Sequence, residues 1–184
     1  MQRIIWLAAV FAMTVMSAFA PQSAVAASAA ELNRESQAAL KALYARAPAA
    51  RELAKKAKGI LVFPGIVKAG LIVGGQYGEG VLYKGGKVAG YYNTAGASYG
   101  LQAGAQKYGY ALFFMSDSTL AYLGKSEGLE IGVGPSVVVM DEGMAKSATT
   151  TTLKDDIYAF IFSQSGLMAG LGLQGNKITK LDKK

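Results

Sequence analysis

The sequence predicts an α+β fold in which two N-terminal amphipathic helices pack on a mainly antiparallel, glycine-rich β-barrel or closed sheet. Two observations carry this prediction. All 23 glycines lie between Gly59 and Gly175, whereas residues 27–58 contain none and are rich in Ala, Leu, Lys, Arg and Glu. Glycine disfavours helices but allows tight turns and close approach of neighbouring strands. The change at Gly59 therefore separates a helical segment, 27–58, from a β-body, 59–184.

The first 26 residues have the form of a signal peptide. Arg3 supplies one positive charge, and residues 4–20 are almost continuously apolar. Ala24-Val25-Ala26 then has the small-x-small pattern of a cleavage site before Ala27. An uncleaved membrane anchor is the alternative, because the apolar run has the length of a short spanning helix. We expect export of a mature chain, residues 27–184, that forms a single domain.

The glycine-free segment is expected to form two helices. Apolar and small residues recur at helical spacing from Leu32 to Ala47. Pro48 follows where a second helix would begin, because proline fits the first helical position. One face of that second helix carries only Leu53 and alanines. Such a face has too little apolar area for deep membrane insertion, so we expect it to pack on the β-body.

After Gly59, short apolar runs alternate with turn residues. Residues 60–63 precede Pro64-Gly65, and Gly85-Gly86 between two lysines predicts a hairpin. Residues 108–115 are typical of a buried strand. Further strands are expected at 66–73, 77–83, 88–92, 99–106, 129–133, 136–140, 157–162, 167–173 and 177–181, with a short helix from 117 or 118 to 123. Many short antiparallel strands favour a barrel, since closure removes exposed sheet edges.

The composition restricts the chemistry of any site. The chain has no histidine and no cysteine, so it lacks an imidazole base, a thiolate and soft metal ligands. Asp155 and Asp156 would point to opposite faces of a strand. Gly170–Gly175 satisfies G-x-G-x-x-G, but too few residues follow it for a βαβ unit. The sequence predicts a non-enzymatic protein without a cofactor or a metal site; a Ser-Lys hydrolase is a third, minor reading.

Six cations form the candidate binding site. Loss of Arg3 with the leader lowers the formal net charge from +7 to +6, which favours anionic partners. The candidate residues lie on the helical segment and the first strand: Arg51, Lys55, Lys56, Lys58, Lys68 and Lys41. They either face an anionic lipid surface or form an ordinary solvated face. Lys68, inside an apolar strand, either reaches a rim or points into a polar interior.

Seven tyrosines fall between Tyr77 and Tyr110. Tyrosine combines an apolar ring with a polar tip, so these residues could line a lipid cavity or form an interfacial belt. Packing in the core or at a rim is the simpler alternative, since strands favour aromatic residues. A small barrel is also able to be filled by its own side chains, which would leave no cavity.

Several glycine-containing segments follow one another in a fixed order. They are Ala57-Lys58-Gly59-Ile60 with Phe63-Pro64, Lys68-Ala69-Gly70 with Gly74-Gly75, Gly78 and Gly80, Tyr99-Gly100 with Gln102-Ala103-Gly104, Gly132–Pro135, and Ser163 with Gly166–Gly170 and residues 175–181. In this order they resemble the SYLF domain, a lipid-binding module of eukaryotic endocytic and actin-associated proteins with many exported bacterial relatives. The resemblance covers roughly residues 32–181.

The resemblance implies phospholipid binding, with basic residues near the N-terminal helices implicated. Phe162, Gln164 and Ser165 depart from the eukaryotic pattern, which is Tyr at the first position and more basic at the others. Phosphoinositide preference and actin binding are therefore not carried over. We expect a periplasmic or peripherally attached protein that binds anionic phospholipid headgroups at an envelope membrane and no nucleic acid. The alternative is a structural envelope protein that binds another protein through the barrel surface.

Overall fold

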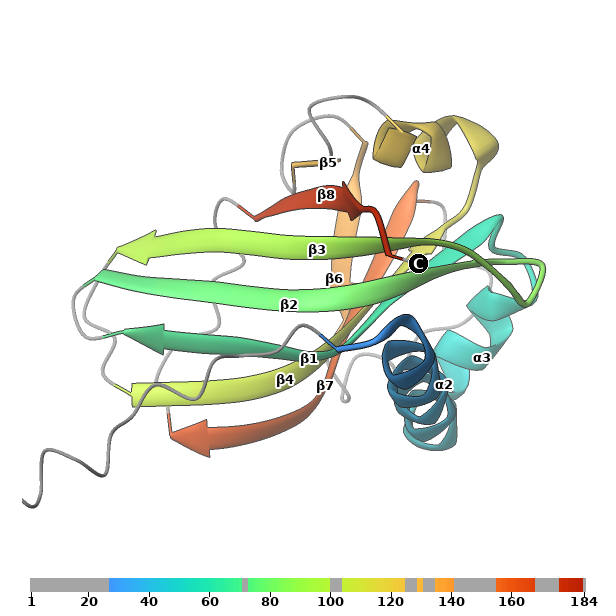
Figure 1. Cartoon of the computed structure of the whole chain (residues 1–184). Helices are drawn as coiled ribbons and strands as arrows, with labels where there is room; N and C mark the ends of the chain where they lie inside the picture. Colours follow the sequence, from blue (N-terminus) through green and yellow to red (C-terminus); the bar gives the residue numbers. More distant parts are fainter. Residues whose placement is uncertain are drawn as a thin grey trace, which may run out of the picture.

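The structure, a computed structural model, describes residues 27–70, 73–99, 104–124, 129–130, 135–140, 155–167 and 176–183. Within these residues, three α-helices and a 3-10 turn accompany one eight-stranded sheet (Figure 1). The predicted signal peptide, the Gly132–Gly134 part of the Gly-Pro motif and Gly170–Gly175 lie outside the described residues. The predictions made for them stay predictions.

The helices are α2 (Ala29–Arg46), α3 (Pro48–Ala54) and α4 (Asp117–Ala121), and η1 (Tyr122–Gly124) is the 3-10 turn. The strands are β1 (Gly59–Gly70), β2 (Val73–Lys84), β3 (Lys87–Tyr99), β4 (Gly104–Phe114), β5 (Leu129–Glu130), β6 (Val137–Met140), β7 (Ile157–Leu167) and β8 (Lys177–Leu181). Strands β1 to β4 run longer than the short apolar segments predicted, because their glycines continue the pairing instead of ending it.

The sheet is open, so the predicted barrel or closed sheet is wrong. The strand order is β5-β8-β3-β2-β1-β4-β7-β6, and every pair is antiparallel except β6 with β7. Within the described part of the chain, the end strands β5 and β6 do not pair with each other. They have two and four residues. Short edge strands limit edge-to-edge association even in an open sheet. The barrel was predicted because closure would also have prevented that association.

The sheet buries side chains on both faces. On the face that we call the helix face, Val62, Phe113 and Phe160 pack with Leu43 of α2 and Leu53 of α3. The opposite face forms a second core against α4 and η1. Leu120 of α4 and Leu123 of η1 belong to this core. The prediction that the second helix packs on the β-body is confirmed, since α3 buries Leu53 together with Ala49 and Ala50.

Local signals set the two N-terminal helices. Ser28 caps α2, because its side-chain oxygen accepts a hydrogen bond from the Glu31 backbone N–H at 3.2 Å. The helix ends before Pro48, which is the first residue of α3 as predicted. Both helices lie against the same sheet face (Figure 1).

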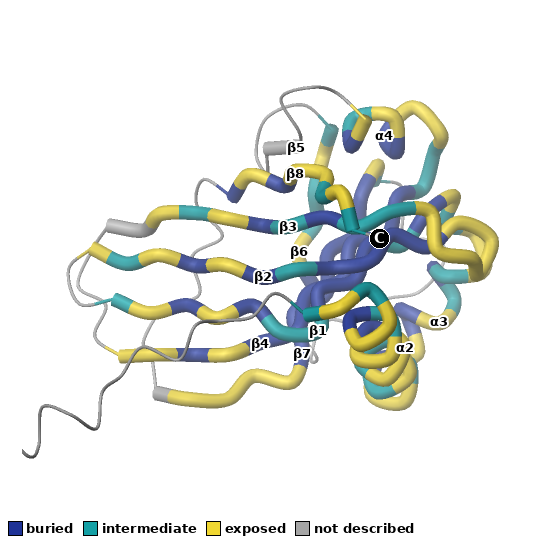
Figure 2. The backbone as a smooth tube through the Cα atoms, viewed as in Figure 1, coloured by how far each residue is buried: buried dark blue, intermediate teal, exposed yellow. Residues whose placement is uncertain are grey.

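Helix α2 covers only part of the helix face. The register of β1 shifts in the segment that contains Pro64-Gly65. Beyond that bulge, Val67, Val73 and Tyr77 are 52%, 67% and 49% exposed. Val67 pairs directly with Tyr77. Figure 2 shows the same division, with one end of the long strands buried and the other end mostly exposed. The uncovered part is the floor of a groove described below.

Tyr110 carries a buried hydroxyl without a hydrogen-bond partner among the described residues. Its ring stacks on Phe63 with centroids 6.4 Å apart, and burial raises the pKa of the Tyr110 hydroxyl. We expect Tyr110→Phe to raise the free energy of unfolding by about 1 kcal/mol, because it removes an unpaired buried polar group. Urea denaturation measures this change, and a destabilised Tyr110→Phe would contradict it.

Tyr108 is the matched control for that substitution. Its hydroxyl is also buried, but it donates to Gln76 Oε1 at 2.9 Å. Burial raises the pKa of Tyr108 to about 12. Because Tyr108→Phe breaks a hydrogen bond, we expect it to lower the free energy of unfolding by about 1 kcal/mol.

Candidate functional site

Five exposed lysines from three segments lie at one end of the sheet. We call this group the basic end; its members are Lys55, Lys56, Lys58, Lys84 and Lys87. The first three link α3 to β1, and the Lys58 backbone N–H donates to Phe114 O at 2.8 Å. Strand pairing brings the other two beside them, since Ile60 pairs with Tyr83 and Lys84 pairs with Lys87. Figure 1 shows the β2–β3 hairpin next to α3.

The hairpin between β2 and β3 places its lysines through glycine geometry. Gly85 and Gly86 have φ of 55° and 78°, the left-handed region that favours glycine. The turn therefore needs only two residues, and Lys84 and Lys87 stand on neighbouring strands at its base. Val88, which is 42% exposed, follows directly.

Within the part of the chain that the structure describes, one carboxylate forms an ion pair with a lysine of the basic end. Lys55 Nζ lies 2.7 Å from Glu52 Oε1, and both side chains are about half exposed, so this ion pair contributes little. Asp117, Asp155 and Asp156 lie at the same end of the sheet but beyond β4, on the β4 and β7 side. Among the described residues, the lysines of the basic end therefore lie on the side formed by α3 and strands β1 to β3, and these three aspartates lie on the other side.

Five of the six predicted cations lie on the helical segment or directly after it. Lys41 on α2 and Arg51 on α3 are exposed, like Lys55, Lys56 and Lys58. The Arg51 guanidinium donates to Tyr44 O at 3.1 Å, which fixes it against the end of α2. Lys84 and Lys87 were missed. The Lys-Gly-Gly-Lys pattern signals only a turn, and the pairing of β2 with β1 decides where that turn lies.

Lys68 does not join the basic end. It lies on β1 ten residues after Lys58, about 30 Å along the strand. Its side chain is only 1% exposed, among the buried polar residues of the sheet. Gln76 and Gln106 are its partners on the neighbouring strands. The sequence left two positions open for Lys68, a rim or a polar interior, and the structure shows the polar interior.

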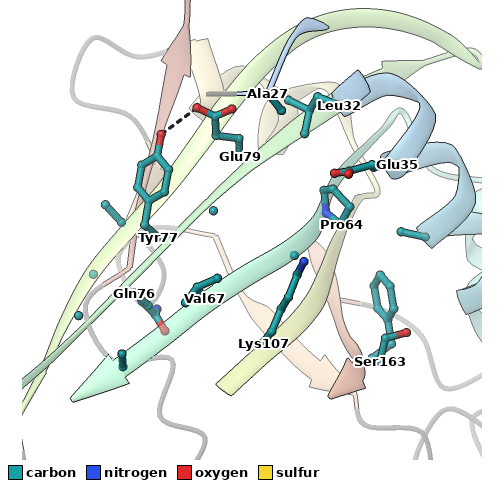
Figure 3. A pocket seen from close by; sticks show the side chains of 18 of the residues that line it. Ala27, Leu32, Glu35, Pro64, Val67, Gln76, Tyr77, Glu79, Lys107 and Ser163 are labelled. Carbon is teal, nitrogen blue, oxygen red and sulfur yellow. Dashed lines mark hydrogen bonds between the residues drawn. The ribbon is translucent and has the colours of Figure 1, made fainter. Parts of the chain in front are cut away.

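A groove of about 1250 Å³ lies on the helix face beside α2 (Figure 3). Val67, Ala69 and Tyr77 form part of its floor, and Leu32 and Ala39 of α2 form part of its wall. Its polar side chains are few: Glu35, Gln76, Tyr77, Glu79, Lys107 and Ser163. The sequence left open whether the β-body offers a cavity; the incomplete cover of the helix face by α2 creates this one.

A hydrogen-bonded network closes one side of the groove. The Tyr77 hydroxyl donates to Glu79 Oε1 at 3.0 Å, and Lys183 Nζ lies 2.6 Å from Glu79 Oε2. Lys183 Nζ also donates to Ala27 O at 2.6 Å, which holds the expected mature N-terminus against the groove. Burial, followed by the hydrogen bond to Glu79, raises the pKa of Tyr77. The ion pair with Lys183 neutralises the Glu79 carboxylate locally.

The tyrosines divide between the two roles predicted for them. Tyr83, Tyr92, Tyr108 and Tyr110 are buried in the cores. Tyr77 lines the groove. Among the tyrosines whose side chains are described, core packing is thus the commoner role, and Tyr77 faces the groove.

The described residues offer neither a metal site nor a membrane-spanning helix. No group of three or more histidine, cysteine, aspartate or glutamate side chains is placed to hold a metal ion there. Among the same residues, no helix is both long enough and apolar enough to cross a membrane.

An open, half-covered sheet with an exposed cationic surface and an apolar groove defines a binding module. Residues 95–184 match the family model described as "Ysc84: Las17-binding protein actin regulator". This match confirms the predicted SYLF resemblance for residues 95–184. No curated protein matches the chain. The matched segment includes β4 to β8, with Lys107 and Ser163 of the groove, whereas the basic end precedes it.

Proposed function

We propose that this chain is an exported, non-enzymatic protein that binds anionic phospholipid and attaches peripherally to an envelope membrane. The observation that carries the proposal is the basic end, where lysines from α3, β2 and β3 form one exposed surface. The family match supports a binding role, and the predicted signal peptide supports export. The absence of histidine and cysteine from the sequence supports a role other than catalysis.

The physical basis is long-range attraction rather than deep insertion. A lysine near an anionic bilayer contributes about 1 kcal/mol, and the attraction falls off within a Debye length. The Lys84–Lys87 hairpin and the backbone bond from Lys58 to Phe114 hold cations from separate segments in fixed relative positions. Val88 adds one exposed apolar side chain beside them. Lys41 and Arg51 extend the cationic surface along the helices.

We expect residues 27–184 to co-sediment with phosphatidylglycerol or cardiolipin vesicles and not with phosphatidylcholine vesicles. Binding should weaken steadily as salt rises from about 50 to 500 mM, because the Debye length shortens from more than 10 Å to less than 8 Å. Co-sedimentation across this series measures the effect. Binding that is equal for neutral vesicles, or that does not change with salt, would contradict attachment through headgroup charge.

A second candidate is an envelope protein that binds another protein. It is favoured by the printed description of the matched family, which names Las17 binding, and by the exposed Val67, Val73 and Tyr77 on the uncovered sheet face. In this case the lysines of the basic end serve solubility alone. The protein would then stay in the supernatant with every vesicle type, and charge reversal at Lys56 and Lys58 would leave its behaviour unchanged.

A further inference from the structure

We propose that the groove beside α2 binds one phospholipid molecule, with an acyl chain along the floor and the headgroup phosphate beside Lys107. This inference rests on the proposed lipid binding but assigns a second surface, separate from the basic end. Tyr77 in the groove and Lys84 at the basic end are seven residues apart on β2, about 23 Å. A lipid in the groove therefore lies away from the surface that the basic end presents to a membrane.

The lining of the groove has the polarity of an amphiphile. Val67 and Ala69 provide an apolar floor, and Leu32 faces them from α2. Lys107 of β4 and Ser163 of β7 both line the groove, and Figure 3 shows them apart, with the Lys107 amine directed toward Pro64. A cation in the groove suits a phosphate, because the ammonium group donates charge-assisted hydrogen bonds to its oxygens. The apolar floor suits the hydrocarbon attached to that phosphate.

The charges at the groove favour a headgroup with one negative charge. Glu79 is paired with Lys183, so its carboxylate is already neutralised. Lys107 and Glu35 form no ion pair among the described residues, and Glu35 faces the groove from α2. One phosphate would be attracted by Lys107, whereas a second negative charge would be repelled by Glu35. A phosphatidylglycerol-type headgroup meets this condition.

The size of the groove favours a lipid over a small metabolite. Its volume of about 1250 Å³ is above the range of roughly 300–1,000 Å³ typical of sites for drug-sized ligands. Three exposed apolar side chains, Val67, Val73 and Tyr77, continue the apolar surface along the sheet. Exposed apolar patches of this kind mark binding surfaces more often than chance contacts.

Gly75 allows the groove to be filled without disturbing the core. It lies two residues before Tyr77 on β2, so its side-chain position faces the same side of the sheet. A Cβ at this position would have Gly96 O, at 3.9 Å, as its nearest contact. The ring in Gly75→Phe therefore projects into the groove. Gly124→Phe is the matched control, because a Cβ there meets nothing within 4 Å and Gly124 does not line the groove.

The test is isothermal titration calorimetry of residues 27–184 with lysophosphatidylglycerol below its critical micelle concentration. We expect binding of one molecule per chain, and affinity about tenfold lower in Gly75→Phe but unchanged in Gly124→Phe. Lys107→Gln should lower the affinity severalfold, whereas the same substitution should not change the affinity for a monoacylglycerol, which has no phosphate. Glu35→Gln should raise the affinity for lysophosphatidylglycerol. Circular dichroism and thermal unfolding show whether each variant is folded.

Several results would overturn the groove assignment. They are unchanged binding in a folded Gly75→Phe, an equal effect of Lys107→Gln on lysophosphatidylglycerol and on the monoacylglycerol, and oleate binding as tight as that of lysophosphatidylglycerol. Vesicle co-sedimentation tests the proposed membrane attachment through the basic end separately. A folded Gly75→Phe that sediments with anionic vesicles yet keeps full lysolipid affinity would refute the groove assignment alone.

Discussion

We expect Lys56→Glu/Lys58→Glu to weaken binding to phosphatidylglycerol vesicles by about 30- to 1,000-fold. Two lysines near an anionic bilayer contribute about 1 kcal/mol each, and two glutamates in their place add repulsion of similar size. The sum, about 2–4 kcal/mol, corresponds to that range in Kd. Both side chains are exposed, and neither forms an ion pair among the described residues. Co-sedimentation at about 100 mM salt measures the change.

Two further double substitutions test whether the expected loss of binding is specific to the basic end. Lys84→Glu/Lys87→Glu changes the net charge equally and lies on the hairpin beside α3, so a similar loss is expected. Lys177→Glu/Lys180→Glu also changes the net charge equally, but these exposed residues lie on β8, where they pair with Ala95 and Tyr92 of β3 and not with the hairpin. Its binding should change by less than about threefold.

The comparison of the three pairs decides between a located surface and a general attraction. Equal losses in all three would show that net charge alone governs binding, and the basic end would then have no special role. A loss confined to Lys56 and Lys58 would limit the contact to the segment after α3. No loss in any pair, in folded proteins, would favour the protein-binding candidate.

Elements that depend on local sequence could be predicted. Pro48 sets the start of α3, because proline at the first helical turn loses no hydrogen bond. Gly85 and Gly86 set the β2–β3 hairpin, because their positive φ values are accessible to glycine. The buried strand predicted at 108–115 is observed as the end of β4, where residues 108–114 are all buried. In each case the information lies within a few neighbouring residues.

The arrangement of the strands could not be predicted in the same way. Whether a sheet closes depends on which strands end up at its edges, and the edge strand β5 pairs with β8, which is far from it in the sequence. Glycine-rich strands are compatible with a barrel and with an open sheet alike. Short edge strands protect the open sheet from edge-to-edge association, and long-range pairing sets the length of these strands.

The candidate site was predicted in part for the same reason. Lys55, Lys56 and Lys58 are neighbours in sequence, so their grouping was visible. Lys84 and Lys87 reach them only through the pairing of Ile60 with Tyr83. Lys68 was grouped with them because it is close in sequence, but ten residues of extended strand carry it about 30 Å away. The groove requires α2 to stop short of Val67 and Tyr77, which no local pattern indicates.

The core beneath α2 and α3 is expected to be the most sensitive part of the molecule. Phe160 of β7 is 1% exposed, and its ring meets Phe113 of β4 edge to face, with centroids 5.2 Å apart. Phe160→Ala should lower the free energy of unfolding by about 3–5 kcal/mol, because it loses buried apolar area and leaves a cavity. Urea denaturation measures this loss. Val139→Ala on neighbouring β6, where the side chain is 36% exposed, should cost less than about 1 kcal/mol.

This packing is also expected to connect stability to the groove. Leu32 of α2 belongs to the same core cluster as Phe160 and also lines the groove wall. A cavity under that cluster loosens the wall, since side chains around a lost ring relax only partly. In folded Phe160→Ala we therefore expect weaker lysophosphatidylglycerol binding but unchanged salt-sensitive vesicle binding, because Lys84 and Lys87 stand on β2 and β3. A loss of unfolding free energy below about 1 kcal/mol would contradict this account of the core.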